Sequence, residues 1–315
     1  MPPHASTSDL LDALLAAAPP STADANVRAW FEATSVARLA HARTIDRALV
    51  GGALADRLGF AFAAGYIEAL HFLVPHLDGI TALCATEADG NHPRAIRTRL
   101  APTGVDHYTL TGHKKWATVA NEASALLVVA STGEDPTTGR NRLRVVRVPT
   151  SSPNLHIRSS AAPFVPEIEH AEVELDGVEV TAADVLPGDG FDDYLKPFRT
   201  VEDLHVHAAL IGYLIAVARR RFFAPSVVES LLALAATTRS LADADVKAPS
   251  THLALAGLIE LSTRLVADVE RAWSSSPTDA EWQRWQRDRP LLHVATKARL
   301  ARRETARTAL LTPHR

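Results

Sequence analysis

The sequence predicts an α+β fold with N-terminal helices, a middle antiparallel β-barrel or sandwich, and a C-terminal helical bundle. Apolar residues recur at helical spacing before about residue 79 and after about residue 190, whereas short apolar runs broken by Gly, Pro and Asp fill the stretch between. Helices and strands that are segregated along a chain are typical of α+β proteins. We therefore expect three domains, at residues 1–78, 79–190 and 191–315.

The N-terminal region predicts a short helix and a buried one. Leucines between residues 10 and 15 recur at helical spacing, and Pro19-Pro20 ends that first helix. Segment 54–73 is rich in Ala, Leu and Phe and is followed by Pro75, so we expect a buried helix there.

The middle and C-terminal regions differ in their periodicity. A hairpin-type loop at residues 131–136 separates the first two of three predicted strands, which are residues 126–129, 143–148 and 172–175. After about residue 190 helical spacing returns and predicts four helices, at about residues 200–221, 226–241, 251–273 and 279–309. Pro290 interrupts the last of them.

Composition indicates an ordinary globular protein. Apolar residues make up 47% and charged residues 22% of the 315 residues, and the net charge is −3. The single cysteine, Cys84, excludes an internal disulfide framework. The N-terminus lacks a secretory pattern, and the apolar run 204–218 is too short and too broken by histidines to span a bilayer. We therefore expect a cytoplasmic protein without a membrane span.

Two short motifs lie in the middle region. Thr86-Glu87 comes first, and Gly112-x-Lys114-x-Trp116-x-Thr118 follows it. Both match, in residue type and order, the segments that face the flavin in the acyl-CoA dehydrogenases, and the order of helices, strands and helices matches as well. The sequence thus resembles that family over most of its length. The resemblance implies its fold and FAD as the cofactor.

The resemblance implies a flavin contact for four residues. A flavin needs hydrogen bonds to its ring edge and an apolar wall. Thr86 would bond the edge of the isoalloxazine and Ala85 would supply backbone close to it. Trp116 would pack against the ring, and Thr118 would bond near N5. The alternative is that Thr86, Trp116 and Thr118 are only strand and core residues.

The chain departs from the family at the substrate segment. The family's proline after Thr-Glu is Ala88 here, and its Ser-Asp pair is replaced by Asn91-His92. By position, Asn91 and His92 would contact the substrate. His92 and Arg94 would then bind an acyl carrier other than CoA, or a phosphate, unless the His-Pro step is only a turn.

The resemblance also implies a carboxylate base. The family's usual Tyr-Glu-Gly, Gly-Gly-x-Gly and Arg-x-x-Phe-Gly segments do not occur in this sequence, which suggests a shortened, divergent member. A minority of the family places the base ten residues before a helix glycine, as Glu202 lies before Gly212. Glu202 is therefore the candidate catalytic base. The alternative is that Glu202 only stabilises the first turn of a helix, with Thr200-x-x-Asp203 as a variant of the capping box.

Metal and nucleic-acid sites are not indicated. His205 and His207 point to different faces of a helix, so each is expected to be a satisfied buried or interfacial histidine rather than a metal ligand. Residues 281–315 hold nine Lys/Arg and three Asp/Glu, a net charge of +6, so the remaining chain carries −9. A solvated helix face is the simplest interpretation of this basic segment, an acidic partner or a phosphate comes next, and nucleic acid last.

These observations predict an acyl-CoA-dehydrogenase-like flavoprotein. The resemblance implies oxidation of an acyl thioester, carried by CoA or by an acyl carrier protein, with α-proton abstraction and transfer of the β-hydride to FAD. Two alternatives stay open: a non-catalytic subunit or scaffold, and a flavin-dependent oxidase of other chemistry. The resemblance also implies a homodimer, or a heteromer with a longer relative.

Overall fold

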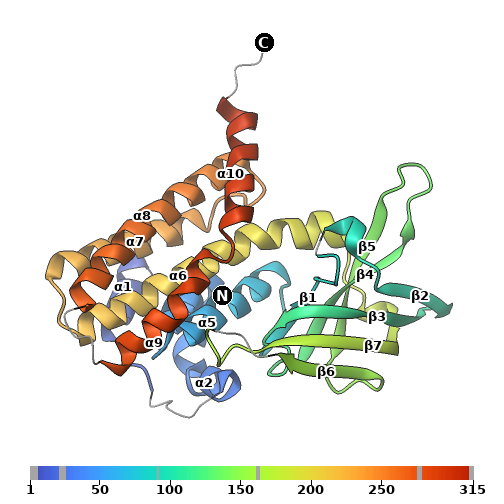
Figure 1. Cartoon of the computed structure of the whole chain (residues 1–315), viewed down its shortest axis with the longest axis horizontal. Helices are drawn as coiled ribbons and strands as arrows, with labels where there is room; N and C mark the ends of the chain where they lie inside the picture. The colour runs from blue at the N-terminus through green and yellow to red at the C-terminus, as the bar shows by residue number, and fades with distance from the viewer. Residues whose placement is uncertain (1–5, 21–25, 91, 161–163, 275–278, 312–315) are drawn as a thin grey trace. The chain divides into compact units, whose positions relative to one another are not determined.

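The computed structural model describes residues 6–20, 26–90, 92–160, 164–274 and 279–311 (Figure 1). The chain divides into two compact units. The helical unit comprises Met1–Phe72 and Thr200–Arg315, and the β unit comprises Leu73–Arg199. Helices flanking a sheet along the chain confirm the predicted α+β fold. The N- and C-terminal helices belong to one unit, and the boundaries of three separate domains stay a prediction.

The β unit is built on one seven-stranded sheet (Figure 1). Its strands, in their order across the sheet, are β1 (Thr81–Cys84), β4 (Ala125–Glu134), β2 (Arg99–Gly104), β3 (His107–Thr118), β7 (His170–Thr181) and β6 (Leu155–Ser160), and β5 (Asn141–Pro149) pairs with β4 beside this path. The sheet is mostly antiparallel, as expected, but β4 pairs in parallel with both β1 and β2. The three predicted strands lie within β4, β5 and β7.

Burial follows the apolar pattern of these strands. Residues 125–130 of β4 are all buried, and this strand pairs with three others, β1, β2 and β5. Three short helical turns complete the β unit: η1 (Pro93–Ala95), η2 (Ala182–Asp184) and the π-helical turn η3 (Gly190–Leu195).

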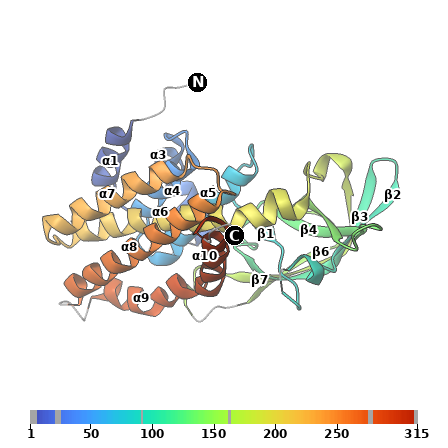
Figure 2. The same ribbon diagram turned by 90° about the horizontal axis from the view of Figure 1, so that it is seen from above.

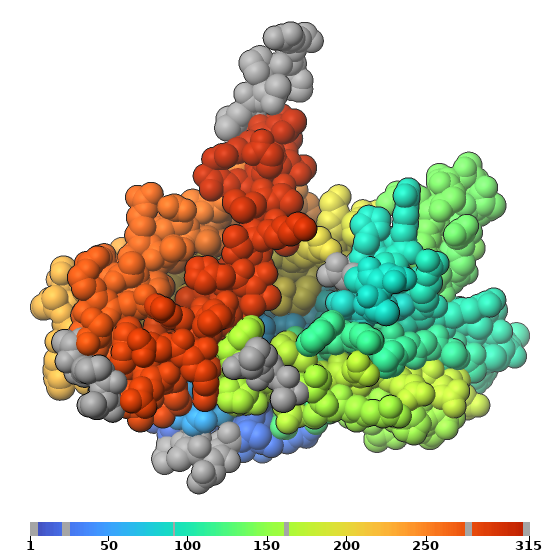
Figure 3. Space-filling view, in the orientation of Figure 1, coloured from blue at the N-terminus to red at the C-terminus, as the bar shows by residue number. Residues whose placement is uncertain are grey.

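The helical unit contains helices from both ends of the chain. The N-terminal set is α1 (Thr7–Ala16), α2 (Val27–Ala33), α3 (Ser35–Leu39), α4 (Thr44–Ala53) and α5 (Leu58–Leu73). The C-terminal set is α6 (Lys196–Arg220), α7 (Pro225–Leu241), α8 (Pro249–Trp273), α9 (Ala280–Asp288), η4 (Arg289–His293) and α10 (Thr296–Leu311). The buried helix expected at 54–73 is α5, and the interruption expected at Pro290 is η4. Figure 2 shows α7 and α8 running side by side, and Figure 3 shows α10 on the surface of this unit.

Helix α6 begins earlier than its sequence suggested. It starts at Lys196, directly after η3, so Thr200 is buried inside the helix and does not cap it. The capping-box interpretation of Thr200 and Asp203 is therefore wrong. Asp203 instead accepts hydrogen bonds from Arg299 at 2.8 Å and Arg302 at 2.5 Å, which tie α6 to α10.

The segment Gly190–Arg220 is long and apolar enough, by length and composition, to cross a membrane, with a mean hydropathy of 1.4. However, 89% of its most apolar window is buried inside the protein, as in the core helix of a globular protein.

Glycines allow α4 and α6 to touch through their backbones. A Cβ on Gly212 would lie 2.0 Å from the carbonyl oxygen of Leu49, and one on Gly52 would lie 1.9 Å from that of Ala209. No side chain fits at either position, so this crossing depends on glycine on both helices. It holds α6 against the N-terminal helices of the same unit.

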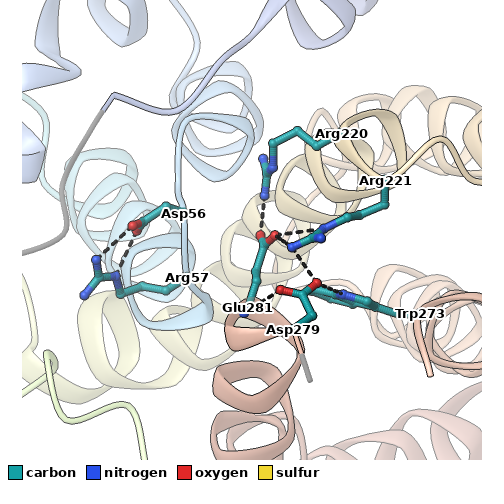
Figure 4. A network of polar contacts seen from close by, with 7 residues as sticks. All are labelled: Asp56, Arg57, Arg220, Arg221, Trp273, Asp279 and Glu281. Carbon is teal, nitrogen blue, oxygen red and sulfur yellow. Dashed lines mark hydrogen bonds and ion pairs between the residues drawn. The ribbon is translucent and has the colours of Figure 1, made fainter. Parts of the chain in front are cut away.

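A polar network ties the end of α6 to the start of α9 (Figure 4). Arg221 contacts both Asp279, at 2.5 Å, and Glu281, at 2.9 Å, while Arg220 pairs with Glu281. The Asp279 carboxylate also accepts a hydrogen bond from Trp273 Nε1 at 3.2 Å. These bonds place the aromatic rings of α8 and α9 against each other, since Trp273 packs on Trp285 at 5.9 Å between ring centroids.

Candidate functional site

A buried ion pair joins the two motifs of the β unit. The ammonium of Lys114 donates to Glu87 Oε1 at 2.6 Å, and the two side chains are 0% and 7% exposed. The same carboxylate accepts the backbone N–H groups of Arg97 at 2.7 Å and Thr98 at 3.0 Å. Both carboxylate oxygens are therefore hydrogen-bonded, which is what makes a buried charge tolerable.

The pKa of each partner reflects this environment. Burial by itself would raise the pKa of the Glu87 carboxyl, but Lys114 and the two backbone N–H groups outweigh it and hold that pKa below its usual value. Burial lowers the pKa of Lys114, and the pairing with Glu87 opposes that change. At neutral pH this ion pair thus links the first motif to strand β3.

Backbone contacts fix the two motifs further. The carbonyl oxygen of Thr86 accepts the N–H of Lys115 at 2.8 Å. A Cβ on Gly112 would lie 2.4 Å from Thr98 Oγ1 and 2.6 Å from its Cα, so only glycine permits this close approach. The structure therefore brings Thr86 and the Gly112–Thr118 segment together, as the motif pairing predicted.

Trp116 lies at a β-bulge with an unusual backbone. The register between β3 and β7 shifts between Lys114 and Ala117, and Trp116 adopts φ 59° while Val119 adopts φ 53°. Left-handed backbone is unfavourable for bulky and β-branched residues. The indole is nevertheless 62% exposed. A strained bulge that presents a large aromatic ring is a feature of binding sites rather than of cores.

His170 is a neighbour of both Trp116 and Thr118 that sequence reasoning missed. Its ring lies edge-on to Trp116 with centroids 6.2 Å apart, and its Nδ1 is 3.3 Å from Thr118 Oγ1. Burial lowers the pKa of His170, so the imidazole is neutral at pH 7. A lone histidine opening a strand carries no sequence signal, because only the register of β7 on β3 places it beside Thr118.

The residues present fit a planar aromatic cofactor that needs polar contacts. Trp116 offers an exposed ring, and Thr118 a partly exposed hydroxyl next to a neutral histidine. The hydroxyl of Thr86, which is half-buried, makes no hydrogen bond to another described residue, so it keeps donor and acceptor capacity. Ala85 is buried beside it at the end of β1. No group of three or more His, Cys, Asp or Glu suited to a metal occurs among the described residues.

The predicted substrate residue His92 follows a tight turn. Glu87 and Gly90 exchange backbone hydrogen bonds at 3.0 Å in both directions. His92 is exposed, and its Nδ1 accepts the N–H of Arg94 at 3.3 Å, which caps η1. This contact is the turn chemistry that the alternative interpretation described. Asn91 lies outside the described residues.

Glu202 belongs to the helical unit, in the second turn of α6, and is half-buried. Its neighbour His205 is a satisfied buried histidine, as predicted. His205 Nδ1 lies 2.8 Å from the carbonyl oxygen of Val201, which can only accept, so Nδ1 carries the proton. Its Nε2 then accepts from the Thr44 hydroxyl at 3.0 Å. Burial lowers the pKa of His205 to about 4.

His207 differs from His205, because it is buried as predicted but its hydrogen bonding within the described chain is incomplete. It is 6% exposed, and its buried Nδ1 has no hydrogen-bond partner in the part of the chain that the structure describes. In the basic segment, Arg289 pairs with Glu270, Arg299 with Asp203 and Arg307 with Glu304. These intrachain pairs support the interpretation of this segment as a helix surface.

Comparison with known proteins adds to this geometry. The family profile described as acyl-CoA dehydrogenase, middle domain, matches residues 82–178, which include both motifs and His170. The probable acyl-CoA dehydrogenase YngJ of Bacillus subtilis (strain 168) is 34% identical over 113 residues. This match covers 35% of the chain and 28% of YngJ, so the chain spans less than a third of that relative.

Solved structures match over nearly the whole chain. Butyryl-CoA dehydrogenase from Megasphaera elsdenii matches with a TM-score of 0.66 and 15% identity, over 98% of this chain and 91% of that one. FMN-bound TdsC from Paenibacillus sp. A11-2 matches with a TM-score of 0.65 and 15% identity, over 98% and 96%. At such identity, the likeness shows a shared fold and nothing finer.

Proposed function

Because residues 82–178 match the middle domain of the acyl-CoA dehydrogenases, we propose that the chain is a member of that family and a flavoprotein that oxidises an acyl thioester. FAD, when bound, supplies the hydride acceptor. In this proposal Thr86, Ala85, Trp116 and Thr118 hold the flavin, and Glu202 removes the α-proton of the substrate. The protein acts in the cytoplasm as a homodimer.

One observation supports the proposal most directly. Trp116 is exposed and strained at a bulge, and the buried ion pair of Lys114 and Glu87 stabilises this bulge. Trp116 is 62% exposed with φ 59°, whereas Lys114, two residues before it, is fully buried against Glu87. An exposed indole held in an unfavourable conformation has no packing role that would explain the strain. A planar ligand against the ring does explain it, because aromatic rings stack on flat partners.

The hydroxyls beside Trp116 support the same proposal. Thr86 and Thr118 can each donate and accept one hydrogen bond at the edge of a heterocycle. His170 is neutral and contacts Thr118, so it fixes the direction of that hydroxyl without adding charge. These groups orient the cofactor, while Glu202 acts on the substrate as a general base.

The substrate carrier is a finer part of the proposal. By sequence position, His92 and Asn91 correspond to the residues with which the family contacts its thioester, and His92 is exposed. We propose an acyl thioester on CoA or on an acyl carrier protein. A phosphate would meet Arg94, which follows His92 in the same turn.

The first experiment is the visible spectrum of the purified full chain, followed by release and identification of any cofactor. A stoichiometric flavin that is released as FAD supports the proposal. Release of FMN, the flavin named with TdsC, would mean that the protein is still a flavoprotein but that its cofactor is FMN and not FAD. A colourless protein that takes up neither flavin contradicts the proposal and favours the non-catalytic subunit.

The role of Glu202 is tested by bleaching of the bound flavin with butyryl-CoA. Glu202→Gln should slow bleaching by roughly 100-fold or more while flavin stays bound, since general bases contribute about 10²–10⁴-fold. The exposed Glu229 on α7 provides the control, because Glu229→Gln removes one carboxylate from the same unit. Unchanged bleaching in Glu202→Gln would exclude it as the base. Turnover with oxygen but without thioester would point to the oxidase.

A further inference from the structure

The helical unit contains a cavity that the proposed function does not use. Its volume is about 620 Å³, and residues of α6, α8, η4 and α10 line it. All of these residues belong to the helical unit, whereas the proposed flavin residues belong to the β unit. Sites for small molecules have volumes of about 300–1,000 Å³, so this cavity is large enough to bind one.

The surface of the cavity wall is more apolar than polar, and aliphatic side chains of four elements contribute to it. Leu210 comes from α6, Ile259 and Val266 from α8, Leu292 from η4 and Leu300 from α10. Leu300 is 57% exposed although it is apolar. A wall of this composition favours a ligand with a hydrocarbon body.

One polar side chain of the cavity lacks a partner. His207 lines it, is more than nine-tenths buried, and has an Nδ1 with no hydrogen bond to any described residue. Burial and the nearby Arg299 lower the pKa of His207 to about 4, although Asp203 opposes them, so the ring is neutral. A neutral imidazole presents one donor and one acceptor. Leaving the buried Nδ1 unmet is unfavourable, and a polar group of a ligand would meet it.

The α10 side of the cavity carries excess positive charge. Arg299, Arg302 and Arg303 all line it. The first two share a single carboxylate, that of Asp203, and Arg303 forms no ion pair with a described residue. Arg289, which lines the cavity from η4, is neutralised by Glu270 at 3.1 Å. The guanidinium of Arg303, which no described carboxylate pairs with, therefore favours an anionic group at α10.

We propose that this cavity binds an aliphatic carboxylate. The hydrocarbon body lies against the walls of α6 and α8. The carboxylate meets the guanidinium of Arg303 and the imidazole of His207. Arg303 suits a carboxylate because a guanidinium donates two parallel hydrogen bonds to its two oxygens.

The test is calorimetric titration of the full chain with decanoate, and with 1-decanol as the uncharged probe. Decanoate should bind with one site per chain and at least about tenfold more tightly than 1-decanol, as a charge-assisted hydrogen bond implies. Arg303→Gln should weaken decanoate binding by a similar factor. Arg307→Gln provides the control, because Arg307 is also on α10 but pairs with Glu304 and does not line the cavity.

Filling the cavity gives a second, independent test. Ala256→Trp places a large ring in the wall from α8 and should abolish decanoate binding. Thr263→Trp does the same from an exposed position, so it is expected to fold even if Ala256→Trp does not. Circular dichroism verifies folding of each variant.

Four results would overturn the proposal. They are no heat with decanoate, equal affinity for decanoate and 1-decanol, unchanged binding in a folded filling variant, and equal weakening by Arg303→Gln and Arg307→Gln. The cavity could instead be covered by a second copy of the chain. Decanoate would then give no heat, and sedimentation equilibrium would show a dimer that Thr263→Trp dissociates. That result would also exclude the cavity as a carboxylate site.

Discussion

Each unit contains a buried ion pair, and the two pairs differ in what holds the carboxylate. In the β unit, Glu87 accepts two backbone N–H groups as well as the Lys114 ammonium. In the helical unit, Glu68 is fully buried, and its Oε1 accepts from Arg38 at 3.1 Å. The Glu68 Oε2 has no hydrogen-bond partner among the described residues, although Arg47 lies 3.8 Å away.

This difference separates an ion pair that fixes the position of the backbone from an ion pair that only packs side chains together. A carboxylate held by backbone N–H groups fixes the path of the chain, so the Glu87 pair sets where Thr86 and β3 lie relative to each other. The Glu68 pair joins side chains of α3 and α5, and Arg38 also donates to the carbonyl of Phe31 at 2.8 Å. The β-unit pair should therefore affect ligand binding, and the helical pair should affect stability alone.

The largest effect is expected from Lys114→Met. It leaves the Glu87 carboxylate buried without its cation, and breaking a buried pair costs about 3–5 kcal/mol. Urea unfolding should show this loss, and flavin binding should weaken with it. Lys115→Met is the control, because Lys115 makes only a half-exposed contact to Glu172 at 3.4 Å. Its cost should stay within about 0.5 kcal/mol.

A smaller effect is expected from Arg38→Met. We expect a loss of about 2–3 kcal/mol in the free energy of unfolding, because Arg47 and His71 remain within 4 Å of Glu68. Flavin affinity, measured by quenching of flavin fluorescence, should not change. A parallel loss of flavin in Arg38→Met and Lys114→Met would remove the distinction between the two pairs.

The buried histidines of the helical unit should make the stability of the protein sensitive to acid. His205 and His207 have a folded-state pKa of about 4 against an ordinary 6.5, so the unfolded chain binds protons first as the pH falls. Stability from these histidines is complete above pH 6.5 and is lost toward pH 4. Glu87, with its lowered pKa, loses stability only below its usual value of 4.5.

The histidine contribution is measurable by urea unfolding at pH 7 and pH 5. Each buried histidine should lower the free energy of unfolding by about 2 kcal/mol between pH 7 and pH 5. His205→Gln should remove about half of the pH dependence that His205 and His207 contribute together, whereas His156→Gln should leave it intact because His156 is exposed in β6. Equal pH dependence in all three proteins would mean that the histidines do not govern it.

The smallest effect on stability is expected from Trp116→Gly. Glycine relieves the left-handed backbone, so stability should stay constant or rise by up to about 1 kcal/mol. Flavin affinity should nevertheless fall by about tenfold or more with the loss of the ring. Asn154→Gly is the matched control, since Asn154 is exposed with φ 62° and lies outside both motifs. A large loss of stability in Trp116→Gly would make the indole a structural residue.

The elements that the sequence predicted are those whose signals are local. Helix α5, the interruption at Pro290 and strands β4, β5 and β7 follow from spacing over a few neighbouring residues. The start of α6 was missed because η3 continues directly into Lys196, where no capping residue marks a boundary. The pairing of Thr86-Glu87 with the Gly112–Thr118 segment was anticipated only through the family resemblance.

The sequence by itself determined the order of helices and strands, the two motifs and the candidate residues Thr86, Trp116 and Glu202. Only the tertiary structure decided that Lys114 is the partner of Glu87, that His205 is satisfied while His207 is not, and that Arg299 neutralises Asp203. The physical reason is distance along the chain. Residues 27 or 96 positions apart meet only when the sheet register and the helix packing place them together, and no local pattern records that.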